Sequence, residues 1–142
     1  LLKMAPDVTE ADMAAIAESA RDRAIDGLII SNTTITRPND LTDVKAAETG
    51  GLSGRPLFEL STAQLRRMYQ LTEGRVPLIG VGGVENAETA LAKIRAGASL
   101  IQLYTSFIYR GPGVITDILD GIRKHISLYN ISNVGALVGR NT

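Results

Sequence analysis

Glycine pairs and hydroxyl side chains recur in this chain where apolar runs stop. Gly82 and Gly83 follow the run "VPLIGV", and Thr105 and Ser106 follow the run "SLIQLY". A glycine has no Cβ, so its backbone N–H can approach a phosphate oxygen closely. Hydroxyl groups add further donors beside it. These four residues therefore favour a phosphate-binding site, although a lone glycine pair also makes ordinary tight turns.

Two other apolar runs also lead into residues that could bind a ligand. Lys3 lies near the end of the first run, and Ser31-Asn32-Thr33-Thr34 ends the second. The long polar segment 33–60 adds "GGLSG", with Gly54 as its last residue. In parallel α/β folds, ligands bind beyond the carboxyl ends of the strands. We expect these positions to converge on one rim, with residues 33–53 closing over the ligand.

The elements that must position these residues alternate between strand and helix. Apolar runs predict strands over 1–4, 26–32, 76–83 and 99–105. Helical spacing and capping residues predict helices over 9–24, 62–74 and 87–96, with N-terminal caps at Thr9, Ser61 and Asn86. Glycines at 74 and 97 are expected to end the second and third helices. A last helix begins at Pro112, with Ile115, Ile118, Leu119 and Ile122 on one face.

This order predicts an α/β fold with parallel strands joined by right-handed crossovers. Two architectures fit. One is a complete four-stranded doubly wound sheet, and the other is half of a (β/α)8 barrel, which needs about 250 residues when whole. Because the sequence begins inside an apparent strand, we expect the half barrel.

Composition argues against several classes of function. The 142 residues carry 15 basic and 15 acidic side chains and no basic run, so nucleic acid is not an expected partner. There is no cysteine and a single histidine, His125, so neither a thiolate nor a histidine metal site is expected. His125 lies late on the last helix and is expected to be a partly packed side chain. No run approaches the roughly 18 apolar residues of a membrane span.

With these motifs in place, the sequence resembles dihydroorotate dehydrogenase, an FMN-dependent (β/α)8 enzyme family of pyrimidine synthesis. The resemblance would make this chain the C-terminal half of the barrel, strands five to eight. The segments "GGLSGRPL" and "AGASLIQLYT" look like the quinone-linked, membrane-associated branch. Five segments carry the match in family order and at family spacing: "KMAPD" (3–7), "DGLIISNTT" (26–34), "ETGGLSGRPL" (48–57), "RVPLIGVGGV" (75–84) and "IRAGASLIQLYTS" (94–106).

The resemblance implies a role for eight residues. Asn32 and Thr33 match residues that hydrogen-bond the orotate ring, whose adjacent C=O and N–H groups suit an amide. Lys3 matches a lysine that lies against the flavin ring, where a fixed positive charge favours hydride acceptance. Without the resemblance, Lys3 would pass for a strand-end lysine and Asn32 for a turn residue. The positions that match FMN contacts are Lys3, Ser31, Gly54, Gly83, Tyr104 and Thr105.

The resemblance also implies parts that this chain does not contain. The catalytic base, a serine on the loop after strand four in this branch, is expected upstream of residue 1, so no catalytic residue is assigned here. The helical pair that takes ubiquinone from the membrane is expected upstream as well. The expected location is the mitochondrial inner membrane in a eukaryote, or the bacterial cytoplasmic membrane as a peripheral protein.

Three alternatives stay open at this point. The chain could belong to another flavin- or phosphate-binding barrel enzyme. It could be a non-catalytic half barrel, or a subunit that needs a separate N-terminal half. The branch could also differ, with fumarate or NAD rather than ubiquinone as the electron acceptor.

Overall fold

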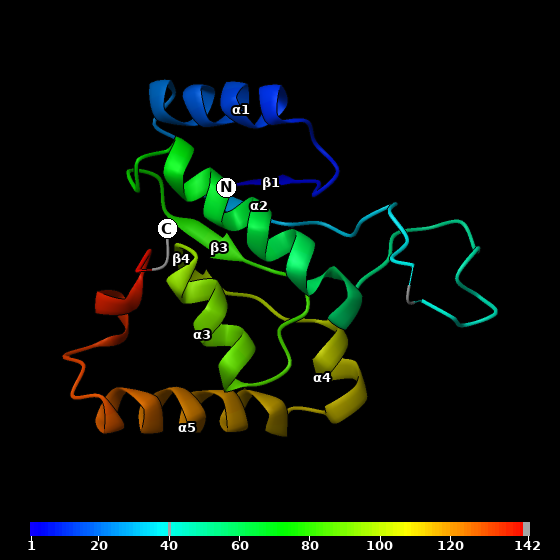
Figure 1. Ribbon diagram of the computed structural model, residues 1–142. Helices are drawn as coiled ribbons and strands as arrows, with labels where there is room; N and C mark the ends of the chain where they lie inside the picture. Colours follow the sequence, from blue (N-terminus) through cyan, green and yellow to red (C-terminus); the bar gives the residue numbers. More distant parts are fainter. Residues whose placement is uncertain (40, 141–142) are drawn as a thin grey trace.

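The computed structural model describes residues 1–39 and 41–140 and contains one parallel sheet (Figure 1). Its strand order follows the order in the chain, and helices connect successive strands. This arrangement confirms the predicted α/β class with parallel strands, and it repeats a strand–helix unit as a (β/α)8 barrel does. The strands are β1 (Leu2–Met4), β2 (Leu28–Ile30), β3 (Leu78–Gly80) and β4 (Ala98–Ile101).

The helices form one layer against this sheet and extend past its last strand. Contacts join α1 to α2, α2 to β2 and β3, and α3 to β4, while α5 packs on α3 and α4. The helices are α1 (Glu10–Asp22), α2 (Phe58–Leu71), α3 (Ala87–Arg95), α4 (Thr105–Arg110) and α5 (Gly113–Leu128), with short 3-10 turns η1 (Arg55–Leu57) and η2 (Val134–Leu137).

Two of the predicted helix caps are confirmed. Thr9 accepts a hydrogen bond from the Asp12 N–H, and the Asp12 carboxylate accepts from the Thr9 N–H, so α1 begins with a reciprocal capping box. Asn86 and Thr89 make the same arrangement at the start of α3. Each cap satisfies backbone donors that a helix otherwise leaves unpaired.

The predicted start and end of α2 are wrong. The helix begins at Phe58, after the η1 turn that contains Pro56, and it ends at Leu71 rather than at Gly74. Proline suits the first turn of a helix because its missing N–H would have no partner there. Ser61 is therefore not a cap but a fully buried residue inside α2.

The predicted strands were too long, and one helix was missed. Backbone pairing between β3 and β4 continues only as far as the bond from Gln102 N–H to the Gly80 carbonyl. The chain then turns, and α4 begins at Thr105, which is the first residue of a helix rather than the last of a strand. The change from strand to helix cannot be seen in the sequence, because the apolar and hydroxyl residues of 99–105 occur in both strands and helices.

The core lies between the sheet and the helices. Met4, Leu28 and Ile30 face Met13 of α1 and Leu65 of α2 in one cluster of buried side chains. The alternate residues of the strands point to the other face of the sheet. Their register places four of them in one row: Lys3, Ile29, Ile79 and Leu100.

The last helix departs from the predicted pattern. Ile118 is buried, and Ile122 is partly buried, against α3. Ile115 and Leu119 are 44% and 55% exposed, so only half of the predicted apolar face is covered within this chain. Val114, which the pattern did not include, is almost fully buried instead.

The long polar segment leaves the body of the molecule and returns to it (Figure 1). A bridge between Thr34 and Leu52 closes its base. Asp7 fixes the same base, because its carboxylate accepts hydrogen bonds from Thr34 Oγ1 and from the Ile35 N–H. Further out, the Arg37 guanidinium donates to backbone carbonyls, those of Ala46, Glu48 and Gly50 among them.

Candidate functional site

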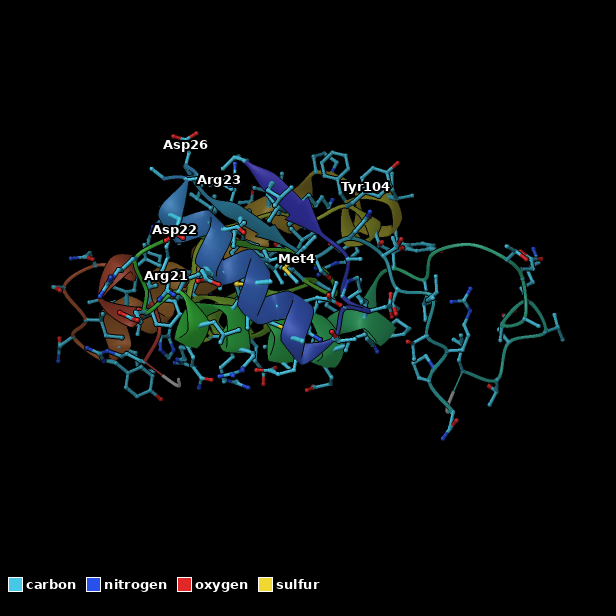
Figure 2. All side chains as sticks on the ribbon, turned by 90° about the horizontal axis from the view of Figure 1, so that it is seen from above. Met4, Arg21, Asp22, Arg23, Asp26 and Tyr104 are labelled. Atoms are coloured by element: carbon cyan, nitrogen blue, oxygen red, sulfur yellow. The ribbon has the colours of Figure 1, made fainter. Side chains whose placement is uncertain are left out.

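A cavity of about 900 Å³ lies beyond the carboxyl ends of the four strands. In Figure 2, Tyr104 lies at this end of the sheet, and Asp26, just before β2, lies at the opposite end. A volume of this size is that of a cofactor-sized binding site. All eight residues singled out in the sequence line this cavity: Lys3, Ser31, Asn32, Thr33, Gly54, Gly83, Tyr104 and Thr105.

The β1 and β2 side of the cavity carries polar side chains. Lys3 is solvent-exposed on β1 and stands in register with Ile29. Ser31 is 1% exposed, and its hydroxyl donates to the Asn32 carbonyl at 2.9 Å. Asn32 Oδ1 accepts from the Thr33 N–H at 2.9 Å, which is the turn interaction that ends many strands. None of the hydrogen bonds between described residues uses the Asn32 amide nitrogen, so its two donors remain available to a ligand.

Glycines let the walls of the cavity approach one another. A Cβ on Gly51 would lie 1.9 Å from Thr33 Oγ1, and one on Gly54 would lie 3.0 Å from Thr105 Cγ2. Gly83 has φ +73°, and a Cβ there would lie 2.4 Å from Phe58 Cβ. The left-handed backbone and the contact with α2 both require glycine at position 83.

Unpaired backbone donors gather where β3 and β4 end. Among the described residues, the N–H groups of Gly83, Val84, Thr105 and Ser106 form no hydrogen bond to a protein acceptor. All four residues line the cavity. The hydroxyl groups beside them are already engaged: Ser106 Oγ donates to the Val84 carbonyl at 2.7 Å, and Thr105 Oγ1 donates to Ser53 Oγ at 3.0 Å. Four N–H groups without a protein acceptor, on residues that line one cavity, are the kind of donor set that a phosphate group needs.

The sequence prediction missed a charged rim beside these donors. Arg55 forms an ion pair with Glu85 at 3.0 Å, and Arg110 donates to the Glu85 carbonyl and pairs with Asp117 at 2.9 Å. Arg55, Glu85 and Arg110 all line the cavity. Recognition of α4 in "TSFIYR" would have drawn attention to Arg110, since that helix begins at Thr105.

A buried lysine behind the glycine turn was also missed. Lys93 on α3 is fully buried, and its Nζ donates to Ser61 Oγ at 2.5 Å. Burial lowers the pKa of Lys93 to about 7, and the nearby Glu59 carboxylate opposes part of that shift. A signal existed in the sequence, because Lys93 shares the buried face of α3 with Ala90 and Ile94 at helical spacing.

Other candidate groups lie away from the cavity. His125 on α5 lies with its Nε2 2.7 Å from Arg95 Nη2, and its ring packs against Tyr129 at 4.6 Å. Among residues 1–39 and 41–140, no three His, Asp or Glu side chains cluster as metal ligands. Within the same residues, no helix combines the length and the apolar character needed to span a membrane.

The chain was compared with models of protein families. A family model described as dihydroorotate dehydrogenase matches residues 1–126. The residues of the cavity fit a phosphate-bearing cofactor such as the FMN of that family, because backbone N–H groups without a protein acceptor suit a phosphate and polar side chains such as Lys3 and Asn32 suit a polar ring.

Related proteins agree with the family match. The chain is 50% identical over 139 residues to the dihydroorotate dehydrogenase (quinone) of Parvibaculum lavamentivorans, and 50% identical over 141 residues to that of Brucella ovis. These alignments cover 98% and 99% of this chain but only 40% and 39% of the relatives. The chain therefore spans about two fifths of the length of these relatives.

Solved structures share the fold over the same span. The ligand-free dihydroorotate dehydrogenase of Eimeria tenella superimposes with a TM-score of 0.95 at 43% identity. The complex of that enzyme with ferulenol gives a TM-score of 0.94 at the same identity. Each covers 99% of this chain, which itself spans 40% and 38% of the two structures.

Proposed function

The chain belongs to the dihydroorotate dehydrogenase family, and from this premise we propose that it supplies the FMN site and one side of the orotate site of a quinone-dependent dihydroorotate dehydrogenase. In this proposal it forms the C-terminal half of a (β/α)8 barrel and works with an N-terminal half. We call the two halves together the assembled barrel. The reaction is the oxidation of dihydroorotate to orotate, with ubiquinone as the electron acceptor.

One observation carries the proposal. Eight residues chosen from the sequence, spread from Lys3 to Thr105, line a single cavity. At one end of it, four backbone N–H groups have no protein acceptor. Bound FMN would supply the redox chemistry, as the acceptor of a hydride from dihydroorotate and the donor of two electrons to the quinone.

The residues of this chain have distinct tasks in the proposed reaction. The N–H groups of Gly83 and Thr105 hold the phosphate, with Gly54 allowing the close approach of its loop to Thr105. Lys3 provides a positive charge that stabilises negative charge on the reduced ring. Ser31 and Tyr104, which also line the cavity, would contact the cofactor, with Tyr104 next to Thr105 at the phosphate-binding end.

The substrate side of the site is carried by Asn32 and Thr33. The free amide donors of Asn32 suit a carbonyl oxygen of the pyrimidine ring, and the Thr33 hydroxyl offers a second polar contact. No residue of this chain is assigned as the base that removes the C5 proton of dihydroorotate. We place that base, and the segment that contacts the membrane and the quinone, upstream of residue 1.

The location proposed for the whole protein follows from the quinone. Ubiquinone is dissolved in the membrane, so the assembled barrel is expected at the bacterial cytoplasmic membrane, or at the mitochondrial inner membrane in a eukaryote. The two relatives named above, both dihydroorotate dehydrogenases (quinone), come from bacteria, which favours the first.

The experiment that tests this proposal is anaerobic reduction of the assembled barrel. It is expected to purify with bound flavin, and dihydroorotate is expected to bleach the flavin absorbance. Ubiquinone, added afterwards, should restore the absorbance faster than fumarate or NAD⁺ does. Absence of flavin, or flavin that dihydroorotate does not reduce, would contradict the proposed activity. Faster recovery with fumarate or NAD⁺ would instead contradict the quinone-linked branch.

A further inference from the structure

A buried cation lies behind the glycine turn that lines the cavity. The Lys93 side chain has no exposed surface, and its Nζ lies 5.2 Å from the centroid of the Phe58 ring. Within the described residues it forms no ion pair with a carboxylate, and its hydrogen bond is to Ser61 Oγ. Burying a lysine without an ion-pair partner costs stability, so the position calls for an explanation beyond packing.

Ser61 connects this lysine to the turn. Its hydroxyl oxygen accepts from Lys93, so the hydroxyl hydrogen is left for a carbonyl. The two carbonyls in range are those of Phe58 at 3.2 Å and Gly82 at 3.3 Å. The first belongs to α2 itself, and the second belongs to the turn after β3. The Phe58 carbonyl already accepts from Thr62 Oγ1 at 2.6 Å, so we assign the Ser61 hydrogen to the Gly82 carbonyl. The Lys93–Ser61 pair then links α3 and α2 to the turn after β3.

The orientation of the Gly82 carbonyl determines the direction of the backbone N–H of Gly83, a residue that lines the cavity. A trans peptide is planar, and its C=O and N–H groups point in opposite directions. The peptide that carries the Gly82 carbonyl also carries the Gly83 N–H. Because Ser61 holds the carbonyl toward the buried side, the Gly83 N–H is directed away from Ser61, toward the cavity that Gly83 lines. That N–H has no protein acceptor among the described residues.

A serine beside a lysine of lowered pKa could also act as a nucleophile and its base. Burial argues against that here. Ser61 and Lys93 are both 0% exposed, and neither lines the cavity. No substrate carbonyl can reach Ser61 Oγ, so the pair acts through the peptide it supports.

We propose that Lys93, acting through Ser61, is a positioning residue that directs the Gly83 N–H at the phosphate group of the ligand. This inference rests on the proposed function for the identity of the ligand, which is FMN. The inference predicts that loss of the Lys93–Ser61 pair weakens the binding of a ligand that has the phosphate and not of one that lacks it, because only the phosphate depends on this pair.

The test compares FMN with riboflavin, which has the same ring and no phosphate, in the assembled barrel. Lys93→Met keeps the length and apolar stem of the side chain but removes the ammonium. We expect it to weaken FMN binding by about tenfold, in line with the loss of one well-directed hydrogen bond to a charged group, and to leave riboflavin binding unchanged. Ser61→Ala is expected to have the same selective effect and serves as the second variant if Lys93→Met does not fold.

Thr72→Val is the matched control. Thr72 is a fully buried residue just past the end of α2, and its Oγ1 donates to the Met68 carbonyl at 2.8 Å, outside the turn. This variant should change the affinity for neither ligand. An unchanged ratio of FMN to riboflavin affinity in Lys93→Met and Ser61→Ala would overturn the inference, as would equal weakening of both ligands. If the unmodified barrel itself bound riboflavin as tightly as FMN, the proposed phosphate site would fail, and the inference with it.

Discussion

At the scale of single residues, Lys3 carries the most direct prediction about chemistry. It lines the cavity from β1, and its charge is proposed to stabilise the reduced flavin ring. In the assembled barrel, Lys3→Met should slow anaerobic reduction of the flavin by dihydroorotate about tenfold to a hundredfold, because a charge positioned for the developing negative charge is lost. Stopped-flow absorbance measures this rate.

Lys124→Met is the matched control for Lys3. Lys124 is an exposed lysine on α5 that does not line the cavity, so its loss should leave the reduction rate unchanged. FMN affinity in Lys3→Met should change by a smaller factor than the rate, because the phosphate contacts remain. Equal reduction rates in Lys3→Met and in the unmodified barrel would show that this charge does not act on the reaction.

Lys93 also predicts how stability depends on pH. Its pKa of about 7 in the folded protein lies below the ordinary lysine value of 10.5 because the side chain is buried. The unfolded state therefore binds more protons between those two pH values, and stability contributed by this group rises as pH increases through that window. The slope from one such group approaches about 1.4 kcal/mol per pH unit. Urea unfolding of the assembled barrel between pH 7 and pH 9 measures it.

Lys93→Met isolates this contribution from other titrating groups. Lys93→Met should have a larger unfolding free energy than the unmodified barrel at pH 7. This advantage should shrink toward pH 9. A difference that stays constant with pH would mean that Lys93 keeps an ordinary pKa in the folded protein. Greater stability together with weaker FMN binding would indicate that the buried lysine is maintained for the site at a cost in stability.

Site residues whose types are unusual for their position in the sequence were predicted, whereas the buried lysine that supports the site was not. Asn32, Gly83 and Thr105 stand out because polar residues and glycine interrupt apolar runs at strand ends. Lys93 is one of 15 basic residues, and its helical spacing with Ala90 and Ile94 places it on the apolar face of α3. A lysine on such a face usually extends its ammonium to solvent, and here the packing of α2 against α3 buries the whole side chain.

At the scale of elements, the contact between the turn after β3 and the start of α2 carries the next prediction. Gly83→Ala would place a Cβ 2.4 Å from Phe58 Cβ and would hold alanine at φ +73°. The turn must move, and the affinity for FMN should fall at least about tenfold, while the unfolding free energy falls by about 1–3 kcal/mol. Flavin fluorescence titration and urea unfolding measure the two effects.

Gly113→Ala is the matched control for Gly83→Ala. Gly113 begins α5, its φ is not in the left-handed region, and a Cβ there would contact nothing within 4 Å. This variant should bind FMN normally and be no less stable. Normal FMN affinity in Gly83→Ala would contradict the role assigned to the turn.

The sequence predicted the start of a helix correctly where a pair of capping residues was present. Thr9 with Asp12, and Asn86 with Thr89, mark the starts of α1 and α3 because the side chains satisfy the first N–H groups. No such side chain precedes α2, where a 3-10 turn leads directly into the helix. No side chain caps α4 either, so its first residue, Thr105, was taken as the end of a strand and the helix itself was missed. α5 has no capping side chain, but Pro112 at its start gave the signal instead.

At the scale of the whole molecule, one face of the sheet is incomplete. The row of Lys3, Ile29, Ile79 and Leu100 lies on the face opposite the helical core, and Leu100 is 63% exposed. In a closed barrel, side chains from all eight strands fill that interior together. Ile79 is buried and Ile29 is half-buried, but Lys3 and Leu100 at the two ends of the row are exposed. These exposed ends support the proposal that a second half completes the fold, as does the 40% coverage of the relatives.

The prediction at this scale concerns the 142-residue chain by itself. It should neither retain FMN through gel filtration nor oxidise dihydroorotate, because the proposed function assigns half of the site and the catalytic base to an N-terminal half. Adding the separately produced N-terminal half should restore flavin binding and turnover. Turnover by residues 1–142 alone would refute the proposed division of the site.

The most direct test of the account is a crystal structure of the assembled barrel with FMN bound. We predict that the phosphate oxygens accept hydrogen bonds from the N–H groups of Gly83 and Thr105, and that the ring lies beside Lys3. A phosphate beside Lys3 with the ring near Thr105, or FMN bound outside this cavity, would contradict the account.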